Sequence, residues 1–450
     1  MTSPGLSASP YRTVSWPFAV GMGLFVLGVC LCLVLYLCHT AGFTSELPQS
    51  QEALPQLQQE EWPSVSVTSD NEAPLNDNLD HPFSFPLHQV SPGLSYGRIR
   101  FQHSQSHFQG TNYQPAQEPV QVHVLVVSSA AIAENSASRP IVRLVPSMAS
   151  STVTGLLPVK TMVEQTGGIA GVNATYFKPD TGTALGLLMI RREIISGPLF
   201  RRAALLMTQD GQYHIEKMGF QGMLLLPEVV GGQSLMIDNV NQPRTDTRHT
   251  VLYSHRWGRV APQIPSDGLQ VQLVGGVVRQ VSETRSLEIP KNGYVISGPK
   301  TLGMISLARL SESDDENKVY FRFHLDPIIP NLLHAVGGGP LLVHNGQLAL
   351  DPASENLEAF PIVQPSPRTA VGIRQDGSLL LVSVEGRRPG VSIGASLQEL
   401  AQLMKNLGAV DAMNLDGGSS TQMVVGDQVV TNAGANKSHM VSNGLVVVPY

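Results

Sequence analysis

Residues 396–421, SLQELAQLMKNLGAVDAMNLDGGSST, contain a helix, a strand and a polar loop in one continuous run. Ser396-Leu397-Gln398-Glu399 has the pattern of a capping box, which begins a helix, and apolar residues then recur at helical spacing. Gly408 supplies a helix stop, and the apolar run over 409–413 predicts a buried strand. The run therefore predicts a helix followed directly by a strand of the core.

The loop after this strand has the composition of a binding site. Asp416 places a carboxylate at the end of the apolar run, and two glycines and three hydroxyl residues follow it. Glycines allow a polar ligand to approach the main-chain N–H groups closely, so we expect such a ligand to bind here. The alternative is an Asp-Gly turn capped by Ser and Thr, the usual role of an isolated Asp-Gly pair. The preceding helix and strand favour the site.

A second helix–strand unit repeats the pattern earlier in the chain. Pro158, at a first-turn position, opens a helix that runs to about Gln165, and a short apolar strand then leads to Asn173. We expect Asn173 and Asp416 to emerge at neighbouring strand ends, where ligand sites of mixed sheets often lie. Alternatively, the asparagines at these strand ends merely cap loops.

Charge and cysteine content exclude several classes of protein. The 450 residues carry a net charge of −6 with acidic and basic residues interspersed, so no basic stripe is present for nucleic acid. All three cysteines lie within residues 18–38. The rest of the chain therefore has no disulfide, no cysteine nucleophile and no cysteine-ligated metal.

The N-terminal part predicts a membrane anchor. Residues 18–38 form an uncharged apolar run long enough to span a bilayer, although a cleaved signal peptide is the alternative. Arg12 precedes the run, and residues 39–97 contain acidic residues but no Lys or Arg. We expect residues 1–17 to be a cytoplasmic tail and the bulk of the chain to be extracytoplasmic. The Pro- and Gln-rich residues 39–97 predict a disordered linker.

Residues 98–450 predict one α+β domain of mixed, largely antiparallel sheets with a few packed helices. β-prone runs flank turn dipeptides, and the clearest hairpins surround Asp376-Gly377 and Asn345-Gly346. Residues 220–330 resemble an insertion, whose Asn239-Val240-Asn241 and Trp257-Gly258 segments we expect to shape substrate choice.

Further polar candidates stand near the predicted strand ends. Arg368 precedes a strand, and Glu385 ends the hairpin around Asp376-Gly377. The glycines of 337–339 fit a close approach of the main chain to a ligand or to a neighbouring strand. The sequence lacks the Gly-x-Ser-x-Gly motif of serine hydrolases, the His-Glu-x-x-His motif of zinc proteases and the Gly-x-x-x-x-Gly-Lys-Ser/Thr phosphate loop. The histidines are scattered. We therefore assign no metal and no cofactor.

Five blocks of sequence together resemble the phosphodiester glycosidase family, over roughly residues 120–449. The blocks are Gly171-Val172-Asn173-Ala174-Thr175-Tyr176-Phe177, Val336-Gly337-Gly338-Gly339-Pro340-Leu341-Leu342-Val343, Pro367-Arg368-Thr369-Ala370-Val371-Gly372, Gly386-Arg387 and Asn414-Leu415-Asp416-Gly417-Gly418-Ser419-Ser420-Thr421. The resemblance implies hydrolysis of the bond between the anomeric carbon of a sugar and a phosphodiester. Because a phosphodiester leaves as a stabilised anion, one carboxylate and one cation could suffice.

The resemblance also implies roles for individual residues. Asp416 would act as nucleophile or base, Arg368 would bind the phosphate, and Asn173 would orient a sugar or phosphate oxygen. Glu385 is the second carboxylate considered. The remaining candidates would bind substrate, several of them by donating hydrogen bonds to the departing oxygens: Asn414, Gly417, Gly418, Ser419, Ser420, Thr421, Gly338, Gly339 and Thr369.

The leading hypothesis is a membrane-anchored, extracytoplasmic hydrolase of sugar-1-phosphodiesters in surface polysaccharide metabolism. Its expected partners are the sugar-phosphate or polysaccharide substrate and the membrane, and the oligomeric state is left open. A non-catalytic polysaccharide-binding or export-associated protein is the second hypothesis. A metal-assisted enzyme that cuts phosphorus–oxygen bonds is the third, and the scattered histidines weigh against it.

Overall fold

The computed structural model describes residues 75–76, 85–102, 118–128, 142–244, 246–312, 317–358, 364–431 and 439–450. All of them belong to one compact unit, Pro63–Tyr450. The predicted cytoplasmic tail 1–17 and membrane span 18–38 lie outside the described residues. Within the described ranges, no helix is both long and apolar enough to cross a membrane.

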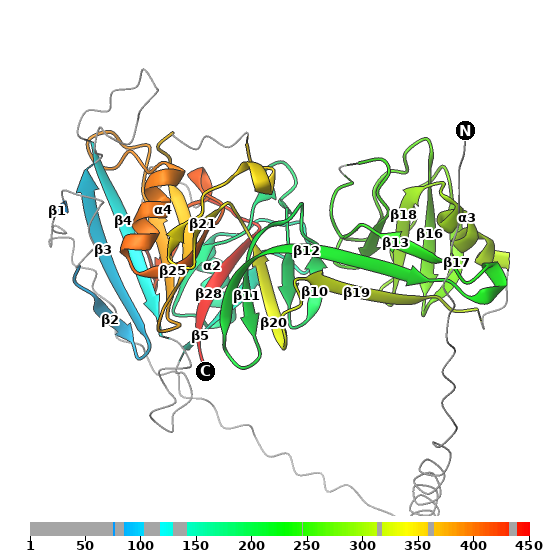
Figure 1. Cartoon of the computed structure of the whole chain (residues 1–450), viewed down its shortest axis with the longest axis horizontal. Helices are drawn as coiled ribbons and strands as arrows, with labels where there is room; N and C mark the ends of the chain where they lie inside the picture. The colour runs from blue at the N-terminus through cyan, green and yellow to red at the C-terminus, as the bar shows by residue number, and fades with distance from the viewer. Residues whose placement is uncertain are drawn as a thin grey trace, which may run out of the picture. The chain divides into compact units, whose positions relative to one another are not determined.

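The largest sheet has nine strands in the order β1-β3-β4-β24-β23-β25-β21-β22, with β2 paired to β3 (Figure 1). Its pairs are antiparallel except for β1 with β3. The strands are β1 (Leu75–Asn76), β2 (His88–Ser91), β3 (Leu94–Gln102), β4 (Pro119–Val127), β21 (Leu341–His344), β22 (Gln347–Leu348), β23 (Arg368–Arg374), β24 (Leu379–Val384) and β25 (Ala409–Asn414).

A five-stranded antiparallel sheet packs against this sheet, in the order β27-β26-β6-β28-β5. Its strands are β5 (Val142–Met148), β6 (Ala170–Asn173), β26 (Met423–Val425), β27 (Gln428–Val429) and β28 (Asn443–Pro449). The main core lies between the two sheets, where Leu125 and Met413 of the first meet Val172 and Leu445 of the second. This position between the sheets explains why β6 and β25 read as short apolar runs.

Helices cover the outer faces of these two sheets. Helix α4 (Leu397–Asn406) buries Leu400 and Met404 against the nine-stranded sheet, near β21 and β25 (Figure 1). Helix α2 (Val159–Thr166) buries Met162 and Val163 against β26 and β28. Both helices begin and end where the sequence predicted, and the capping box at Ser396 and Glu399 is present.

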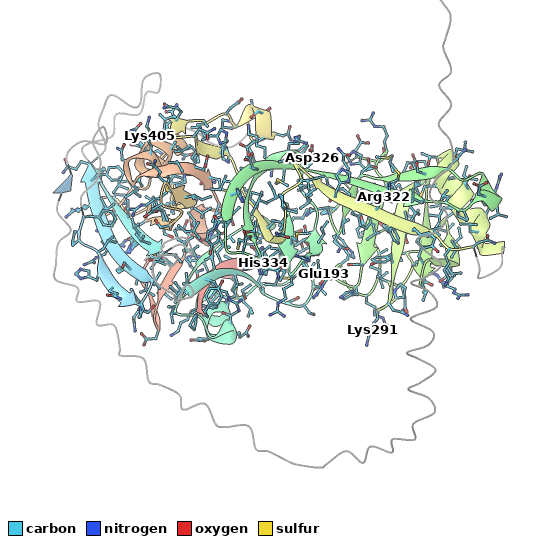
Figure 2. The ribbon with its side chains drawn as sticks, turned by 60° about the horizontal axis from the view of Figure 1, so that its bottom comes forward. Glu193, Lys291, Arg322, Asp326, His334 and Lys405 are labelled. Atoms are coloured by element: carbon cyan, nitrogen blue, oxygen red, sulfur yellow. The ribbon has the colours of Figure 1, made fainter. Side chains whose placement is uncertain are left out.

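The segment between Gly219 and Asp326 builds a separate sheet and core. Its sheet, β14-β15-β18-β16-β17, packs against helix α3 (Leu302–Arg309). The long strand β12 leads into the segment and β19 leads out, because they pair from Gly219 with Asp326 to Leu225 with Tyr320. Arg322 and Asp326 mark the course of β19 in Figure 2. The predicted insertion at 220–330 spans these elements.

The remaining elements complete the described structure. The strands of the separate sheet are β14 (Asn239–Val240), β15 (Val251–Ser254), β16 (Gly268–Val274), β17 (Val277–Ser282) and β18 (Gly293–Pro299). A seven-stranded sheet contains β9 (Leu188–Ile190), β10 (Glu193–Ser196), β11 (Arg202–Thr208), β12 (Tyr213–Leu225), β13 (Ser234–Ile237), β19 (Tyr320–Asp326) and β20 (Leu332–Gly337). The short elements are the hairpin of β7 (Phe177–Lys178) and β8 (Thr183–Ala184) and the 3-10 helices η3 (Glu228–Val230), η4 (Leu310–Glu312), η5 (Ala353–Glu355) and η6 (Gly418–Ser420).

The predicted fold class is confirmed in its coarser form. The described sheets are mostly antiparallel and carry three α-helices, which makes the protein α+β or mainly β. Both predicted hairpins are present, as β23 with β24 and as β21 with β22. The predicted end of the linker at residue 97 is wrong, because β2 and β3 begin earlier and Leu94 and Tyr96 are buried in the core. Nearby prolines concealed the alternation of buried residues in β3.

Candidate functional site

Asp416 lies in a tight loop between β25 and η6. Its main-chain N–H donates to the carbonyl of Ala174 at 2.9 Å, which ties the loop to the end of β6. Its Oδ1 accepts the N–H of Gly417 at 2.9 Å, and the Ser420 side chain also bonds its carboxylate. Gly418 has φ +62°, a conformation that glycine adopts without strain. The Gly417 N–H and the Ser420 side chain therefore hold the carboxylate, while the Asp416 main chain is tied to the end of β6.

Burial raises the pKa of Asp416 to about 6, against the lowering effect of its bonds from Ser420 and Gly417. Removing a carboxylate from water disfavours its charged form, and here this effect exceeds the hydrogen bonding. The carboxyl group can consequently gain or lose a proton close to neutral pH. Such a pKa suits a group that acts as base or nucleophile.

Asn173 holds the Asp416 loop from the adjacent sheet. Its Nδ2 donates to the carbonyl of Asp416 at 2.6 Å, and its Oδ1 accepts from the Thr369 hydroxyl at 2.7 Å and the Gln422 N–H at 3.1 Å. The side chain is fully buried. The two polar strand ends do meet as expected, but β6 and β25 belong to different sheets. In this geometry Asn173 ties the Asp416 loop to Thr369 and Gln422.

Arg368 lies beside the Asp416 loop and is buried. Its Nε donates to the carbonyl of Ala395 at 2.9 Å, and one terminal nitrogen donates to the carbonyl of Gln364 at 3.1 Å. The main chain of Gly417 packs on it, since a Cβ there would lie 3.8 Å from the Arg368 Cδ. The fork predicted to clamp a phosphate thus spends two of its N–H groups on main-chain carbonyls.

Tyr176 is buried beside the end of β25, where the charges of both predicted catalytic groups act on it. Its hydroxyl donates to the carbonyl of Gly339 at 2.7 Å and accepts from Asn414 Nδ2 at 2.8 Å. Burial and then the charge of Asp416 raise the pKa of Tyr176, whereas the charge of Arg368 lowers it. Both charges act on one phenol, so Asp416 and Arg368 share a neighbourhood. Tyr176 belongs to one of the five sequence blocks, but no role was predicted for it.

Arg387 is a second cation near the loop and was not among the predicted site residues. A Cβ on Gly418 would lie 3.1 Å from a terminal nitrogen of its guanidinium. Arg387 is exposed and has φ +60°. In the part of the chain that is described, its side chain forms no ion pair or hydrogen bond. Its charge also lowers the pKa of Arg368, an effect smaller than that of burial. A positive φ at a residue other than glycine often marks a functional site, but the sequence alone does not reveal this conformation.

Glu385 belongs to a different network. One of its carboxylate oxygens bonds His123 at 2.8 Å and the other bonds Arg388 at 2.8 Å. His123 in turn bonds the Tyr96 hydroxyl at 2.7 Å. Glu385 is buried, and these partners fix the end of β24 against β4 and β3. The structure gives Glu385 ion-pair partners of its own instead of placing it with Asp416.

The predicted glycines of 337–339 approach a neighbouring strand. A Cβ on Gly338 would lie 2.5 Å from the carbonyl oxygen of Asn414, and one on Gly339 would lie 2.5 Å from a carboxylate oxygen of Glu355. Glu355 is fully buried and accepts the N–H groups of Ala203 and Leu341. Of the two explanations offered by the sequence, packing against a strand accounts for Gly338.

The predicted hydroxyls differ in their environments. Ser419 is exposed, whereas Ser420 and Thr421 are buried. Among the described residues, the Thr421 hydroxyl and the Oδ1 of Asn414 are buried without a hydrogen-bond partner. Unsatisfied buried polar atoms are costly and often mark functional sites. Ser419 is thus the hydroxyl of this loop that solvent reaches.

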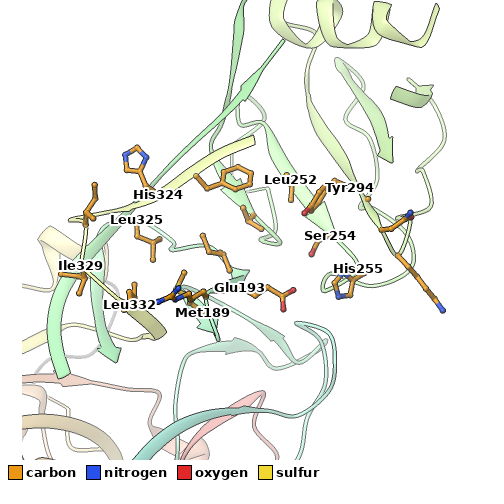
Figure 3. A pocket seen from close by; sticks show the side chains of 18 residues that line it. Met189, Glu193, Leu252, Ser254, His255, Tyr294, His324, Leu325, Ile329 and Leu332 are labelled. Atoms are coloured by element: carbon orange, nitrogen blue, oxygen red, sulfur yellow. The ribbon is translucent and has the colours of Figure 1, made fainter. Parts of the chain in front are cut away.

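A cavity of about 640 Å³ lies elsewhere, between β9, β10, β20 and the separate sheet. Glu193 and His255 stand at one end of it, and Leu325, Ile329 and Leu332 stand at the other (Figure 3). Its lining includes none of the predicted site residues. Within the described ranges, no group of three or more His, Cys, Asp or Glu side chains is arranged to hold a metal ion.

Residues 267–448 match the family model described as phosphodiester glycosidase, which confirms the resemblance deduced from the sequence blocks. The matched region contains Arg368, Arg387 and Asp416, whereas Asn173 lies before it. It begins within the segment 220–330, whose assignment as an insertion stays a prediction. The match supports a glycosidase-type hydrolase.

The fold is similar to those of several solved structures. A hypothetical protein from Synechocystis is 22% identical with a TM-score of 0.66, covering 80% of this chain and 63% of that one. A putative exported protein from Burkholderia pseudomallei K96243 is 18% identical with a TM-score of 0.65, covering 84% and 99%. The zebrafish N-acetylglucosamine-1-phosphodiester alpha-N-acetylglucosaminidase catalytic domain, auto-inhibited by its pro-peptide, is 15% identical with a TM-score of 0.42, covering 80% and 85%.

A curated relative matches over a short stretch. The SPbeta prophage-derived uncharacterized protein YomE of Bacillus subtilis (strain 168) is 36% identical over 66 residues, which is 15% of this chain and 10% of that protein. The chain thus spans about a tenth of this relative and less than two thirds of the Synechocystis protein.

Proposed function

We propose that the protein hydrolyses sugar-1-phosphodiesters by breaking the bond between the anomeric carbon and oxygen. The observation that carries this proposal is Asp416: a carboxyl of raised pKa, held by the Gly417 N–H and the Ser420 side chain, in a loop beside two guanidinium groups. A group that ionises near neutral pH can attack, or activate water against, a carbon that becomes positively charged in the transition state. The family match at residues 267–448 supports the same reaction class.

The proposed reaction balances with water as the only co-reactant. The bond from C1 to the phosphoester oxygen breaks, and that oxygen leaves with the phosphate. Water supplies the hydroxyl that returns to C1, and its remaining proton is released or passed to the product. Asp416 acts either as the base that takes this proton or as a nucleophile that forms a glycosyl ester, which water then cleaves.

The two arginines supply the positive potential for the phosphate. Arg387 is exposed beside Gly418 and can reach a bound anion directly. Arg368 is buried and fixed by carbonyls, so it contributes mainly through its charge. A phosphate bound beside the loop would be attracted by both guanidinium charges.

The cellular setting is part of the proposal. We infer that residues 18–38 anchor the protein in a membrane and that the catalytic domain acts outside the cytoplasm. Surface polysaccharides that carry sugar phosphates are the substrates that such a location would offer. The motivation is the apolar run followed by an acidic stretch free of Lys and Arg.

Hydrolysis in ¹⁸O-labelled water tests the reaction. The probes are the methyl phosphodiesters of α-glucose 1-phosphate, α-galactose 1-phosphate and α-N-acetylglucosamine 1-phosphate. We expect free sugar together with methyl phosphate that carries no ¹⁸O, because the oxygen from water goes to carbon. Label in the phosphate would instead indicate cleavage of the phosphorus–oxygen bond, and loss of that activity on adding a chelator would show that a metal ion assists it. No turnover of the panel, with binding retained, would favour the non-catalytic hypothesis.

Arg387→Gln should lower kcat/KM on these phosphodiesters by about tenfold, because one charge-assisted contact to the phosphate is lost. The residue is exposed, so the melting temperature should hardly change. Arg388→Gln is the matched control, since Arg388 is committed to Glu385 and should cost stability but little kcat/KM. An unchanged kcat/KM in the Arg387 variant would remove Arg387 from the phosphate site.

A further inference from the structure

A cavity of about 450 Å³ opens between the β7–β8 hairpin and the segment 243–265. Neither the proposed reaction nor the family resemblance uses it. Its lining combines two cations, Arg244 and Lys178, with the rings of Tyr253 and Trp257. Pockets for small polar ligands typically have this make-up, in which apolar and aromatic walls carry a few oriented polar groups.

Arg244 is held in place and still has a donor to give. One terminal nitrogen donates to the Ser297 hydroxyl at 2.8 Å, which fixes the guanidinium. The other terminal nitrogen, NH1, is buried and has no hydrogen-bond partner among the described residues. A charged donor left without a partner is costly, and an anionic acceptor would relieve that cost. Burial lowers the pKa of Arg244, and the smaller opposing effects come from Tyr253 and then the exposed Asp267.

The aromatic wall is held by a ring contact and a hydrogen bond. The Tyr253 and Trp257 rings meet edge to face with centroids 5.0 Å apart, and the Tyr253 hydroxyl donates to the carbonyl of Gln242 at 3.1 Å. Tyr253 is buried in a small apolar cluster with Leu287 and Val295, and the half-buried Trp257 packs against that cluster. An indole ring of this kind offers an apolar surface to the C–H face of a sugar.

The cavity is close to the candidate active site along the chain. Lys178 follows Tyr176 by two residues, so their Cα atoms are at most about 7 Å apart. Tyr176 is the residue on which both Asp416 and Arg368 act. The segment after Tyr176 folds back as the β7–β8 hairpin, and the Leu185 N–H donates to the Tyr176 carbonyl at 2.7 Å. One loop therefore connects the two places.

We propose that this cavity is a subsite for a negatively charged sugar unit, with Arg244 and Lys178 binding its phosphate and Trp257 contacting its ring. The inference deepens the proposed function and rests on it: the occupant would be a phosphate-bearing unit of the same glycan, next to the bond that is cleaved. The substrate class is then a polymer or oligomer of sugar phosphates instead of an isolated sugar-1-phosphodiester.

Fluorescence of Trp257 tests this subsite in the full-length chain. The protein has three tryptophans, so Trp16→Phe together with Trp62→Phe leaves Trp257 as the single emitter. The probes are glucose 6-phosphate, inorganic phosphate and glucose. Glucose 6-phosphate should change the Trp257 emission with the tightest binding, because it alone satisfies both the cations and the ring.

Arg244→Gln should weaken glucose 6-phosphate binding by about tenfold or more, and Lys178→Gln should weaken it by a smaller factor because Lys178 is exposed. Arg248→Gln is the matched control, since Arg248 lies in the same segment but pairs with Asp246 and does not line the cavity. Should Arg244→Gln fail to fold, the exposed Lys178→Gln variant and the three probes still give the answer.

The outcome is separable from that for the proposed reaction. Asp416→Asn should leave the Trp257 response unchanged, because Asp416 does not line this cavity. No response to glucose 6-phosphate, or equal binding in wild type and both cation variants, would overturn the subsite while leaving hydrolysis unaffected. Equally tight binding of inorganic phosphate and glucose 6-phosphate would overturn the role of the ring. A normal response in a protein that hydrolyses no phosphodiester would overturn the proposed function alone.

Discussion

Asp416→Asn should lower kcat for release of free sugar by about a thousandfold or more, because the amide can neither attack carbon nor accept a proton. The substitution keeps the size of the side chain and its bond from the Gly417 N–H. Binding of the phosphodiester should persist, so KM should change much less than kcat. The measurement is release of sugar from the methyl phosphodiesters, with single-turnover kinetics to separate binding from chemistry. Activity close to that of wild type would rule out Asp416 as the reacting group.

The pH dependence follows from the raised pKa of Asp416. As base or nucleophile it must be ionised, so kcat/KM should rise with pH up to a plateau above about 6. An unperturbed aspartate would place this rise near pH 4. The profile of the Asp416→Asn residual activity should lack the rise. A plateau that extends unchanged to pH 4.5 would contradict the assignment.

The same carboxyl should weaken the fold at neutral pH. Its folded-state pKa lies above its unfolded value, so the folded state binds the extra proton between pH 4 and pH 6. The stabilisation is fully present below pH 4 and is lost as pH rises through 6. Asp416→Asn should therefore raise the free energy of unfolding at pH 7.5, on the order of 2 kcal/mol, with the gap closing at pH 4. Asp427→Asn, in the exposed turn between β26 and β27, is the control and should change neither activity nor this gap.

Local signals in the sequence were sufficient for the individual elements of the fold. The capping box, the glycine stop and the turn dipeptides act within a few residues, and the helix at 397–406 and both hairpins follow from them. Partnership between distant strands has no such local signal. The β6 and β25 strands look alike in sequence, yet they join different sheets because β28 pairs with β6 and β23 pairs with β25.

The site was predictable in composition but not in the roles of its cations and second carboxylate. Glu385 reads as a carboxylate at a strand end, and its partner His123 lies 262 residues away in sequence, so the buried pair could not be foreseen. Arg368 was predicted to clamp a phosphate. The main-chain carbonyls that its guanidinium binds are brought to it by tertiary packing, which the sequence does not show. Arg387 lies beside Gly418 at a left-handed turn of the main chain, which the sequence does not show.

Asn173→Ala should reduce both the free energy of unfolding and kcat. The separate changes in kcat and in KM test whether Asn173 positions Asp416 or contacts the substrate. The variant loses three hydrogen bonds and leaves the Asp416 carbonyl and the Gln422 N–H without this partner. Buried groups left in this way should cost about 3 kcal/mol of the free energy of unfolding, measured by urea denaturation. If Asn173 acts only by holding the loop, kcat should fall about a hundredfold with KM nearly unchanged, because the ground-state contacts to substrate remain.

Asn443→Ala separates this positioning from a general loss of packing. Asn443 is equally buried and accepts the Thr175 N–H at 3.0 Å, on the same stretch of chain, but its side chain has no bond to the Asp416 loop in the described structure. It should therefore lose similar stability with a much smaller fall in kcat. If both variants lost kcat in proportion to stability, Asn173 would be a structural residue only. A rise in KM confined to Asn173→Ala would instead support the substrate contact that the sequence suggested. The Asp416 carbonyl, 2.6 Å from Asn173 Nδ2, is the feature that makes the first of these results the expected one.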